Sequence, residues 1–235
     1  MTKTVAAILA GGSGTRFGSS RPKQFEMLAG HTIIEHTIKA FESHELIDSI
    51  IVVMHPTCIA DTEKLIQKNS FKKVVKIVSG GENRSLSSMA AIEACEGLSK
   101  TDIDILIHDA ARPLVSSKII SDVVNALKNS KAVNVAVSST DTLIRIDDQG
   151  SMLKIPDRNF IKHVQTPQGF KLSTISKAYE LAFNDPDFSA TDDCGVVFKY
   201  LPEVKIAVVE GDKMNVKITQ KEDIVLAEAI YNLRK

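Results

Sequence analysis

The 235-residue sequence has little cysteine, no excess charge of either sign and no long apolar run. Its three cysteines, Cys58, Cys95 and Cys194, are widely spaced and form neither a disulfide framework nor a zinc-ligand pattern. Lys plus Arg and Asp plus Glu both number 29, which argues against a broad nucleic-acid or membrane surface, because such surfaces need a basic excess. There is no apolar span of about 18 residues and no charged-then-apolar leader. We therefore expect a cytoplasmic protein without a membrane partner.

The most informative stretch is a glycine-rich loop, Ala10–Gly18, that follows the apolar run Val5–Leu9. An apolar run ending in a glycine-rich turn is typical of a strand that delivers backbone N–H groups to a bound anion. Glycine lets the backbone approach such an anion closely, and Arg16 and Lys23 add positive charge. This pattern indicates a triphosphate site, with an ordinary surface turn as the alternative.

Two other kinds of phosphate loop are excluded by the same residues. A Walker loop needs Gly-Lys followed by Ser or Thr, and this stretch has no such sequence. A dinucleotide fingerprint needs a third glycine three residues after the second. Gly12 and Gly14 fit the first two positions, but Phe17 occupies the third.

Strand-like and helix-like segments alternate along the chain, which favours an α/β fold with a mostly parallel sheet and helices on both faces. The apolar runs predict strands at 4–9, 49–54, 74–78, 103–107, 132–137 and 205–209. Helical periodicity predicts helices at 60–68, 86–97, 117–129, 173–183 and 221–233, and another after the capping-box spacing Thr32 to Glu35. No repeat or linker divides the chain, so we expect a single domain over residues 1–235.

Residues 138–160 interrupt this rhythm and predict a projecting hairpin arm. Residues 138–146 have the pattern of a strand, 147–150 of a turn, and 152–155 of a short returning strand. A two-stranded ribbon of this size is marginal on its own. A second protomer would give it a surface to pack on.

Further polar groups follow predicted strands. Residues 80–85 form a second glycine turn, and small polar groups there, such as Ser87, can contact the edge of a nucleobase. Asp109 follows the predicted strand at 103–107, and a buried carboxylate at the tip of such a strand needs a partner or a metal. Mg²⁺ held by this carboxylate and substrate phosphates is one possibility, and a structural pair with Arg112 is the other. His108 is interpreted as orienting its neighbours, and Thr191 lies in a polar loop.

These blocks, in this order, resemble the cytidylyltransferases that join CMP to a polyol phosphate. The resemblance covers essentially the whole chain and is carried by Leu9–Gly12, His108–Pro113, Gln165–Gln168, Thr191–Asp192 and Asn215–Thr219. It implies a Rossmann-like nucleotidyltransferase fold, CTP as co-substrate and Mg²⁺ as cofactor.

The resemblance also implies the residues of the nucleotide side. The first loop would hold the triphosphate with Arg16 and Lys23 as catalytic cations, and the second glycine turn would read cytosine. Asp109 would help to hold Mg²⁺. The implied nucleotide-binding set is Ala10, Gly11, Gly12, Gly14, Thr15, Gly81, Glu82, Ser87 and Asp109.

On the alcohol side, the resemblance implies that Lys217 and Arg158 bind the phosphate and act in catalysis. Arg158 and Thr142 would come from the arm of a second protomer, so the enzyme would be a homodimer. The remaining implied substrate-binding set is Arg112, Asp141, Thr142, Thr166 and Thr191.

The residues point in two directions on the identity of the alcohol. Ile144, where methylerythritol-type members commonly have a lysine, and the segments 155–158 and 191–194 resemble ribitol-phosphate members. His108–Arg112 resembles methylerythritol-phosphate members instead. On this balance we expect D-ribitol 5-phosphate to be converted to CDP-ribitol, with 2-C-methyl-D-erythritol 4-phosphate, a substrate of isoprenoid biosynthesis, as the alternative.

The expected reaction joins CTP and the alcohol phosphate and releases pyrophosphate. The attacking phosphate oxygen is already ionised, so no general base is needed, and cations bring the anions together. A nucleotide-binding module without catalysis would not need the second set of cations, Arg112, Arg158 and Lys217. A hexose-phosphate nucleotidyltransferase would share the first loop but not the blocks at 165–168 and 215–219.

Overall fold

A computed structural model gives the structure of the chain and describes residues 2–12, 17 and 22–234. Among the predicted site residues, Gly14, Thr15 and Arg16 lie outside the described residues.

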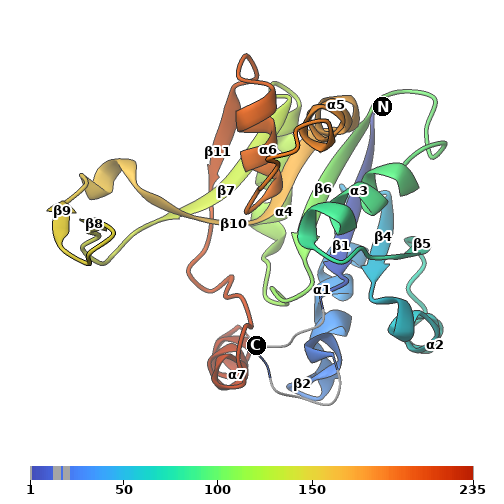
Figure 1. The fold of residues 1–235 in the computed structure, drawn as a ribbon. Coiled ribbons are helices and arrows are strands. Elements are labelled where there is room, and N and C mark those ends of the chain that lie inside the picture. The colour runs from blue at the N-terminus through green and yellow to red at the C-terminus, as the bar shows by residue number, and fades with distance from the viewer. Residues whose placement is uncertain (1, 13–16, 18–21, 235) are drawn as a thin grey trace.

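A seven-stranded sheet forms the centre of the protein, in the order β11-β7-β10-β6-β1-β4-β5 (Figure 1). Its neighbouring strands are parallel, except that β10 runs antiparallel to both β6 and β7. The prediction of a mostly parallel sheet is therefore confirmed. The strands are β1 (Lys3–Ala10), β4 (Ser49–Met54), β5 (Val74–Ser79), β6 (Ile103–Asp109), β7 (Ala132–Ser138), β10 (Lys162–Lys171) and β11 (Ile206–Glu210).

Strand β10 is the one strand of this sheet that the sequence patterns did not predict. It carries Pro167 and glutamines, and proline in a strand pattern argues against a central strand because it cannot donate to the ladder. The structure accommodates Pro167 at an irregularity, where the pairing of β10 with β7 shifts register between Gln165 and Gly169. A Cβ on Gly169 would come within 2.5 Å of Val123, so this position brings β10 against the helix that covers it.

Helices cover both faces of the sheet, as predicted. One buried cluster joins strand residues to α1, α2 and α4, and a second joins the opposite strand faces to α3, α5 and α6. The alternation of strand side chains between the two faces places Ile8 in the first cluster and Ala7 in the second. The helices are α1 (Ile33–Glu42), α2 (Ile59–Asn69), α3 (Arg84–Ala94), α4 (Ser117–Leu127), α5 (Leu172–Phe183), α6 (Asp193–Tyr200) and α7 (Glu222–Leu233).

One helix start was predicted from the sequence and another was not. The capping box at Thr32 and Glu35 is present, because the Thr32 side chain accepts from the Glu35 N–H while the Glu35 carboxylate accepts from the Thr32 N–H. The segment at Thr191, predicted as a polar loop, instead leads into α6. Asp192 caps that helix by accepting a hydrogen bond of 2.8 Å from the Gly195 N–H, which is a helix-start signal rather than a loop signal.

Helix α7 packs beside the short strand β2 (Met27–Leu28), which pairs with β3 (His31–Thr32), rather than on the sheet (Figure 1). A third buried cluster joins Ala227 and Ile230 of α7 to Leu28 and Ile218. Within the described residues, no helix is long and apolar enough to cross a membrane.

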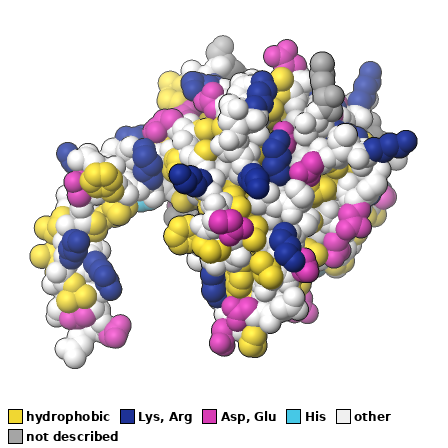
Figure 2. Space-filling model, turned by 90° about the horizontal axis from the view of Figure 1, so that it is seen from above, with side chains coloured by type: hydrophobic (Ala, Val, Ile, Leu, Met, Phe, Trp, Pro, Cys, Tyr) yellow, Lys and Arg dark blue, Asp and Glu magenta, His cyan; other side chains and the backbone are white. Residues whose placement is uncertain are grey.

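The arm projects from the ends of β7 and β10, away from the sheet (Figure 1). Its ladder is shorter than predicted: only β8 (Arg145–Ile146) and β9 (Met152–Lys154) pair, followed by the 3-10 turn Arg158–Phe160. The prediction of a continuous strand over 138–146 is wrong, because β7 ends at Ser138 and the next six residues are not in a strand. Figure 2 shows hydrophobic side chains spread along the arm, and the exposed ones are Ile144, Ile146, Met152, Leu153, Ile155 and Phe160.

Candidate active site

Two glycine turns meet at the carboxyl ends of β1 and β5. A Cβ on Gly11 would lie 3.2 Å from the Gly80 Cα and 3.0 Å from the Ser87 Oγ. A Cβ on Gly81 would lie 2.2 Å from the Leu86 Cβ. The close approach of the two turns therefore favours glycine at position 11, and the close packing against Leu86 requires glycine at position 81.

A cavity of about 330 Å³ opens beside these turns. It brings together predicted residues from five separate parts of the chain, which is what the strand-end argument anticipates. The predicted residues on its wall are Gly11, Gly12, Lys23, Gly81, Glu82, Ser87, Asp109 and Lys217. Ala10 does not line the cavity; it ends β1 and is buried.

Lys23 and Gln24 connect the first turn to the rest of the site. The Lys23 Nζ donates to the carbonyl of Ile218 over 2.9 Å. The Gln24 Nε2 donates to the carbonyls of Ala10 and Gly12 over 2.9 and 3.1 Å. The side chain of Gln24 is therefore a positioning element of the glycine loop. Sequence reasoning missed this role, although Gln24 directly follows Lys23.

Asp109 lies at the end of β6 between two cations. Its Oδ2 is 2.7 Å from the Lys217 Nζ and its Oδ1 is 3.6 Å from the Arg84 Nε. Burial raises the pKa of this carboxyl, but Arg84 and Lys217 outweigh burial and hold the pKa of Asp109 well below its usual range. The predicted alternative of an Asp109–Arg112 pair is not what the structure shows, because the Arg112 Nη1 donates to the carbonyl of Asn215 over 2.7 Å.

The ionised Asp109 carboxylate fits the chemistry of a Mg²⁺ ligand. Over residues 2–12, 17 and 22–234, however, no group of three His, Cys, Asp or Glu side chains is placed to hold a metal ion. An ion at Asp109 would therefore take most of its ligands from substrate phosphates and water, which is usual for Mg²⁺.

His108 precedes Asp109 in β6, is fully buried and makes two hydrogen bonds. Its Nδ1 is 3.0 Å from the Thr166 Oγ1, and its Nε2 is 3.1 Å from the carbonyl of Arg112. Thr166 Oγ1 also accepts from the Asp109 N–H over 3.1 Å. Burial lowers the pKa of His108 to about 4, so the imidazole is neutral near pH 7. These contacts support an orienting role for His108.

A second cavity of about 250 Å³ shares Arg84, Asp109 and Lys217 with the first. The two cavities therefore adjoin along a wall of charged side chains. The second one brings together the predicted alcohol-side residues of the sheet: Arg112, Thr166, Thr191 and Lys217. Arg84 and Asp192 also line it, and sequence reasoning assigned neither a role.

The three predicted residues of the arm stand apart from both cavities. Asp141, Thr142 and Arg158 are exposed on the arm and line neither cavity of their own chain. Figure 1 shows the arm extending away from the strand ends that carry the other residues. Of the described residues, the cavities of one chain thus bring together the predicted ones of the body, apart from Ala10, but not those of the arm.

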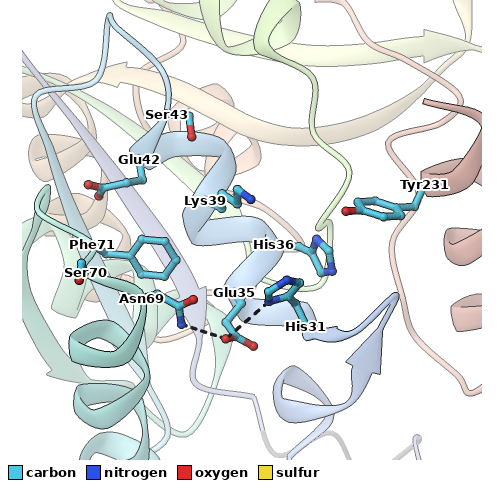
Figure 3. A pocket seen from close by; sticks show the side chains of 10 residues that line it. All are labelled: His31, Glu35, His36, Lys39, Glu42, Ser43, Asn69, Ser70, Phe71 and Tyr231. Carbon is cyan, nitrogen blue, oxygen red and sulfur yellow. Dashed lines mark hydrogen bonds and ion pairs between the residues drawn. The ribbon is translucent and has the colours of Figure 1, made fainter. Parts of the chain in front are cut away.

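Another pocket, of about 400 Å³, lies between α1, the end of α2 and α7 and contains none of the predicted residues (Figure 3). The Glu35 carboxylate on its wall accepts from the Asn69 side chain over 2.9 Å and lies 3.9 Å from the His31 imidazole. His36 faces the Tyr231 ring, with ring centroids 5.1 Å apart. These contacts join three helices, and the pocket lies outside the charged wall of the two cavities.

Comparisons with known proteins agree with the geometry of the site. Residues 4–233 match the family model for 2-C-methyl-D-erythritol 4-phosphate cytidylyltransferase, IspD. A protein of that name from Thermobifida fusca is 44% identical, over 97% of this chain and 93% of its own length. A bifunctional ribulose 5-phosphate reductase/CDP-ribitol pyrophosphorylase from Haemophilus influenzae is 39% identical, over 99% of this chain but 49% of its own length.

A solved structure, the 4-diphosphocytidyl-2C-methyl-D-erythritol synthase from Anaerococcus prevotii, has a similar fold. It superposes with a TM-score of 0.86 at 30% sequence identity, covering 100% of this chain and 99% of its own. The likeness includes the whole chain rather than the nucleotide-binding half alone.

Proposed function

The chain belongs to the IspD family of cytidylyltransferases, and from this premise we propose that its alcohol substrate is 2-C-methyl-D-erythritol 4-phosphate. The enzyme is a CTP-dependent polyol-phosphate cytidylyltransferase. The proposal replaces our expectation of ribitol 5-phosphate, because the relatives favour the methylerythritol alternative.

The relatives carry this choice, and the position of the block His108–Arg112 supports it. The block that resembles methylerythritol-type members, His108–Arg112, supplies Asp109 and Arg112 to the two cavities. The residues that resemble ribitol-type members are divided: Ile144 and Ile155 are exposed on the arm and Cys194 is 3% exposed in α6, whereas Thr191 and Asp192 line the second cavity. These positions therefore do not separate the two alcohols by themselves, and the choice of methylerythritol phosphate rests on the relatives.

In the proposed reaction a phosphate oxygen of the alcohol attacks the α-phosphorus of CTP in line and pyrophosphate leaves. Lys23 and Lys217 stabilise the charge of the phosphates on the two sides of Asp109, and Arg16 would join them. When bound, Mg²⁺ supplies charge neutralisation at the phosphates, with Asp109 as its protein ligand. The residues of the site would provide proximity and preorganised charge, which together account for much of the rate of such transfers.

We also propose a cytoplasmic homodimer in which Thr142 and Arg158 of one arm complete the site of the other protomer. The support is that both residues are exposed and line neither cavity of their own chain. A symmetric pair would exchange the same arm in both directions.

Pyrophosphate release with four NTPs and matched concentrations of the two polyol phosphates tests the substrate. We expect CTP to be preferred, and kcat/KM for methylerythritol phosphate to exceed that for ribitol 5-phosphate by more than about tenfold, since unpaired polar site groups penalise the wrong alcohol. A preference for ribitol 5-phosphate would refute the choice of alcohol and leave the reaction type intact. Activity with only a hexose 1-phosphate would refute both.

A further inference from the structure

Arg84 occupies the boundary between the two cavities. It is the first residue of α3, directly after the second glycine turn, and its side chain lines both cavities. Its Nη1 lies 2.6 Å from the Asp193 Oδ2, and its Nε lies 3.6 Å from the Asp109 Oδ1. The remaining nitrogen, Nη2, is buried and has no hydrogen-bond partner among the described residues. The two carboxylates therefore fix the position of the guanidinium.

Asp193 is the other end of this connection. Its side chain is 0% exposed, and its Oδ1 accepts from the Tyr179 hydroxyl over 2.7 Å. Its backbone N–H donates to the Gln168 Oε1 over 3.1 Å. Asp193 thus lies two positions after the predicted alcohol-side residue Thr191. Contacts from β10, α5 and α3 fix its position.

The positive charge of Arg84 is well defined. Burial lowers the pKa of Arg84, but Asp193 and Asp109 outweigh burial and raise it above its usual value. A buried ion pair is costly to form and is often replaceable by apolar residues without loss of stability. Stability alone is therefore a weak reason for an ion pair that links the second glycine turn to the segment at Thr191, 107 positions further along the chain.

We propose that Arg84 and Asp193 are a positioning pair that sets the alcohol-side segment Thr191–Asp193 against the nucleotide side of the site. This inference rests on the proposed function and adds two residues to it. Neither side chain is assigned a contact with substrate. Asp193 acts through the position of Thr191, and Arg84 acts through its hold on both Asp193 and Asp109.

Asp193→Asn is the central variant, because it keeps the size of the side chain and removes its charge. The amide would place either a second donor toward Arg84 or a weaker, uncharged acceptor there. We expect KM for the alcohol phosphate to rise about tenfold or more, as small misplacements of a binding group cost this much. KM for CTP should change by less than about threefold, because the glycine turns and Lys23 are untouched.

Asp104→Asn is the matched control. Asp104 is also a buried carboxylate paired with a cation, the Lys171 Nζ at 2.6 Å, but it lies at the opposite end of β6 from Asp109. This variant should lower the melting temperature while both KM values stay near those of the wild type. If Asp193→Asn behaves like Asp104→Asn, the pair is structural only and the proposal is wrong.

Tyr179→Phe keeps the experiment decisive if Asp193→Asn does not fold. It removes only the hydroxyl that fixes Asp193, so we expect a smaller rise in KM for the alcohol phosphate, about threefold, with KM for CTP unchanged. Unchanged KM values in this variant would then refute the positioning role. The wild type is assayed first with both polyol phosphates: activity with neither refutes the proposed function, whereas an active wild type whose variants keep their KM values refutes the positioning pair alone.

Discussion

The body of the sheet and the arm present their predicted site residues in opposite ways. On the body, Asp109 is nearly buried and is held by Lys217 and by Arg84. On the arm, Thr142 and Arg158 are exposed, and the ladder beneath them contains only β8 and β9. The body therefore brings its predicted residues together within one chain, whereas the arm exposes its predicted residues to the outside.

This difference has a physical basis. Parallel strands bring their carboxyl ends to one edge, so residues distant in sequence meet there without further design. A short ribbon has no such organising sheet and is marginal by itself. Its exposed apolar residues, among them Phe160 at 84% exposure, need another surface to cover them. The comparison predicts that the body supplies most of the charge for the chemistry, while the arm supplies the contact between protomers and, with Arg158, one further cation.

Removing a cation from the body should have the largest effect. In Lys23→Ala we expect kcat to fall by about 10²–10³, the usual cost of losing one preorganised charge donor. The melting temperature should change little, because Lys23 lies in a short 3-10 turn of the active-site loop. Steady-state pyrophosphate release and thermal unfolding measure the two quantities.

Lys64→Ala is the control for this change. Lys64 is exposed on α2 and pairs with Asp61 over 3.6 Å, remote from both cavities. It should leave both quantities unchanged. Near-normal turnover in Lys23→Ala would remove this residue from the mechanism.

Mixing protomers tests whether the arm serves the other chain. Arg158→Ala and Lys23→Ala should each be nearly inactive alone. In an equal mixture, about half of the dimers are mixed, and each mixed dimer has one site with both residues intact. Activity should therefore recover to about a quarter of the wild-type value.

Arg145→Ala is the control, because Arg145 lies on the same arm. It takes the place of Arg158→Ala in the mixture, and it should be active by itself, without mixing. Subunit exchange is verified by sedimentation of differently sized protomers. A mixture that recovers nothing despite exchange would show that the arm completes the site of its own chain.

The regular part of the fold could be predicted from the sequence because buried strands consist of runs of apolar residues. The runs at 49–54 and 103–107 coincide with β4 and with most of β6. The prediction failed at β10 and α6 for a shared reason: both carry polar groups that serve the site rather than the core. Gln168, for example, is 0% exposed and donates to Asp192 over 2.6 Å.

At Arg84, the sequence contains a signal that predicts an ion pair. A cation at the first position of a helix faces the positive end of the helix dipole, which is unfavourable without a compensating anion. Such a residue predicts an acidic partner elsewhere, and the structure supplies Asp193 and Asp109. The identity of those partners depends on the packing of α6 against the sheet, which no local pattern specifies.

Truncating an apolar side chain on the surface of the arm should have the smallest effect on folding. Comparing it with the truncation of a buried side chain in the body tests the difference between the two regions directly. Phe170 in β10 is 0% exposed and Phe160 on the arm is 84% exposed. Phe170→Ala should lower the free energy of unfolding by about 3–5 kcal/mol, as truncating a buried aromatic does. Phe160→Ala should change it by less than about 0.5 kcal/mol in protein dilute enough to be monomeric.

The same variant should raise the dimer dissociation constant by about fivefold or more, because exposed aromatics commonly anchor interfaces. Denaturant unfolding and sedimentation at several concentrations separate the two effects. A loss of monomer stability comparable to that of Phe170→Ala would mean that the arm is part of the folded body, and an unchanged dissociation constant would place Phe160 outside the contact between protomers.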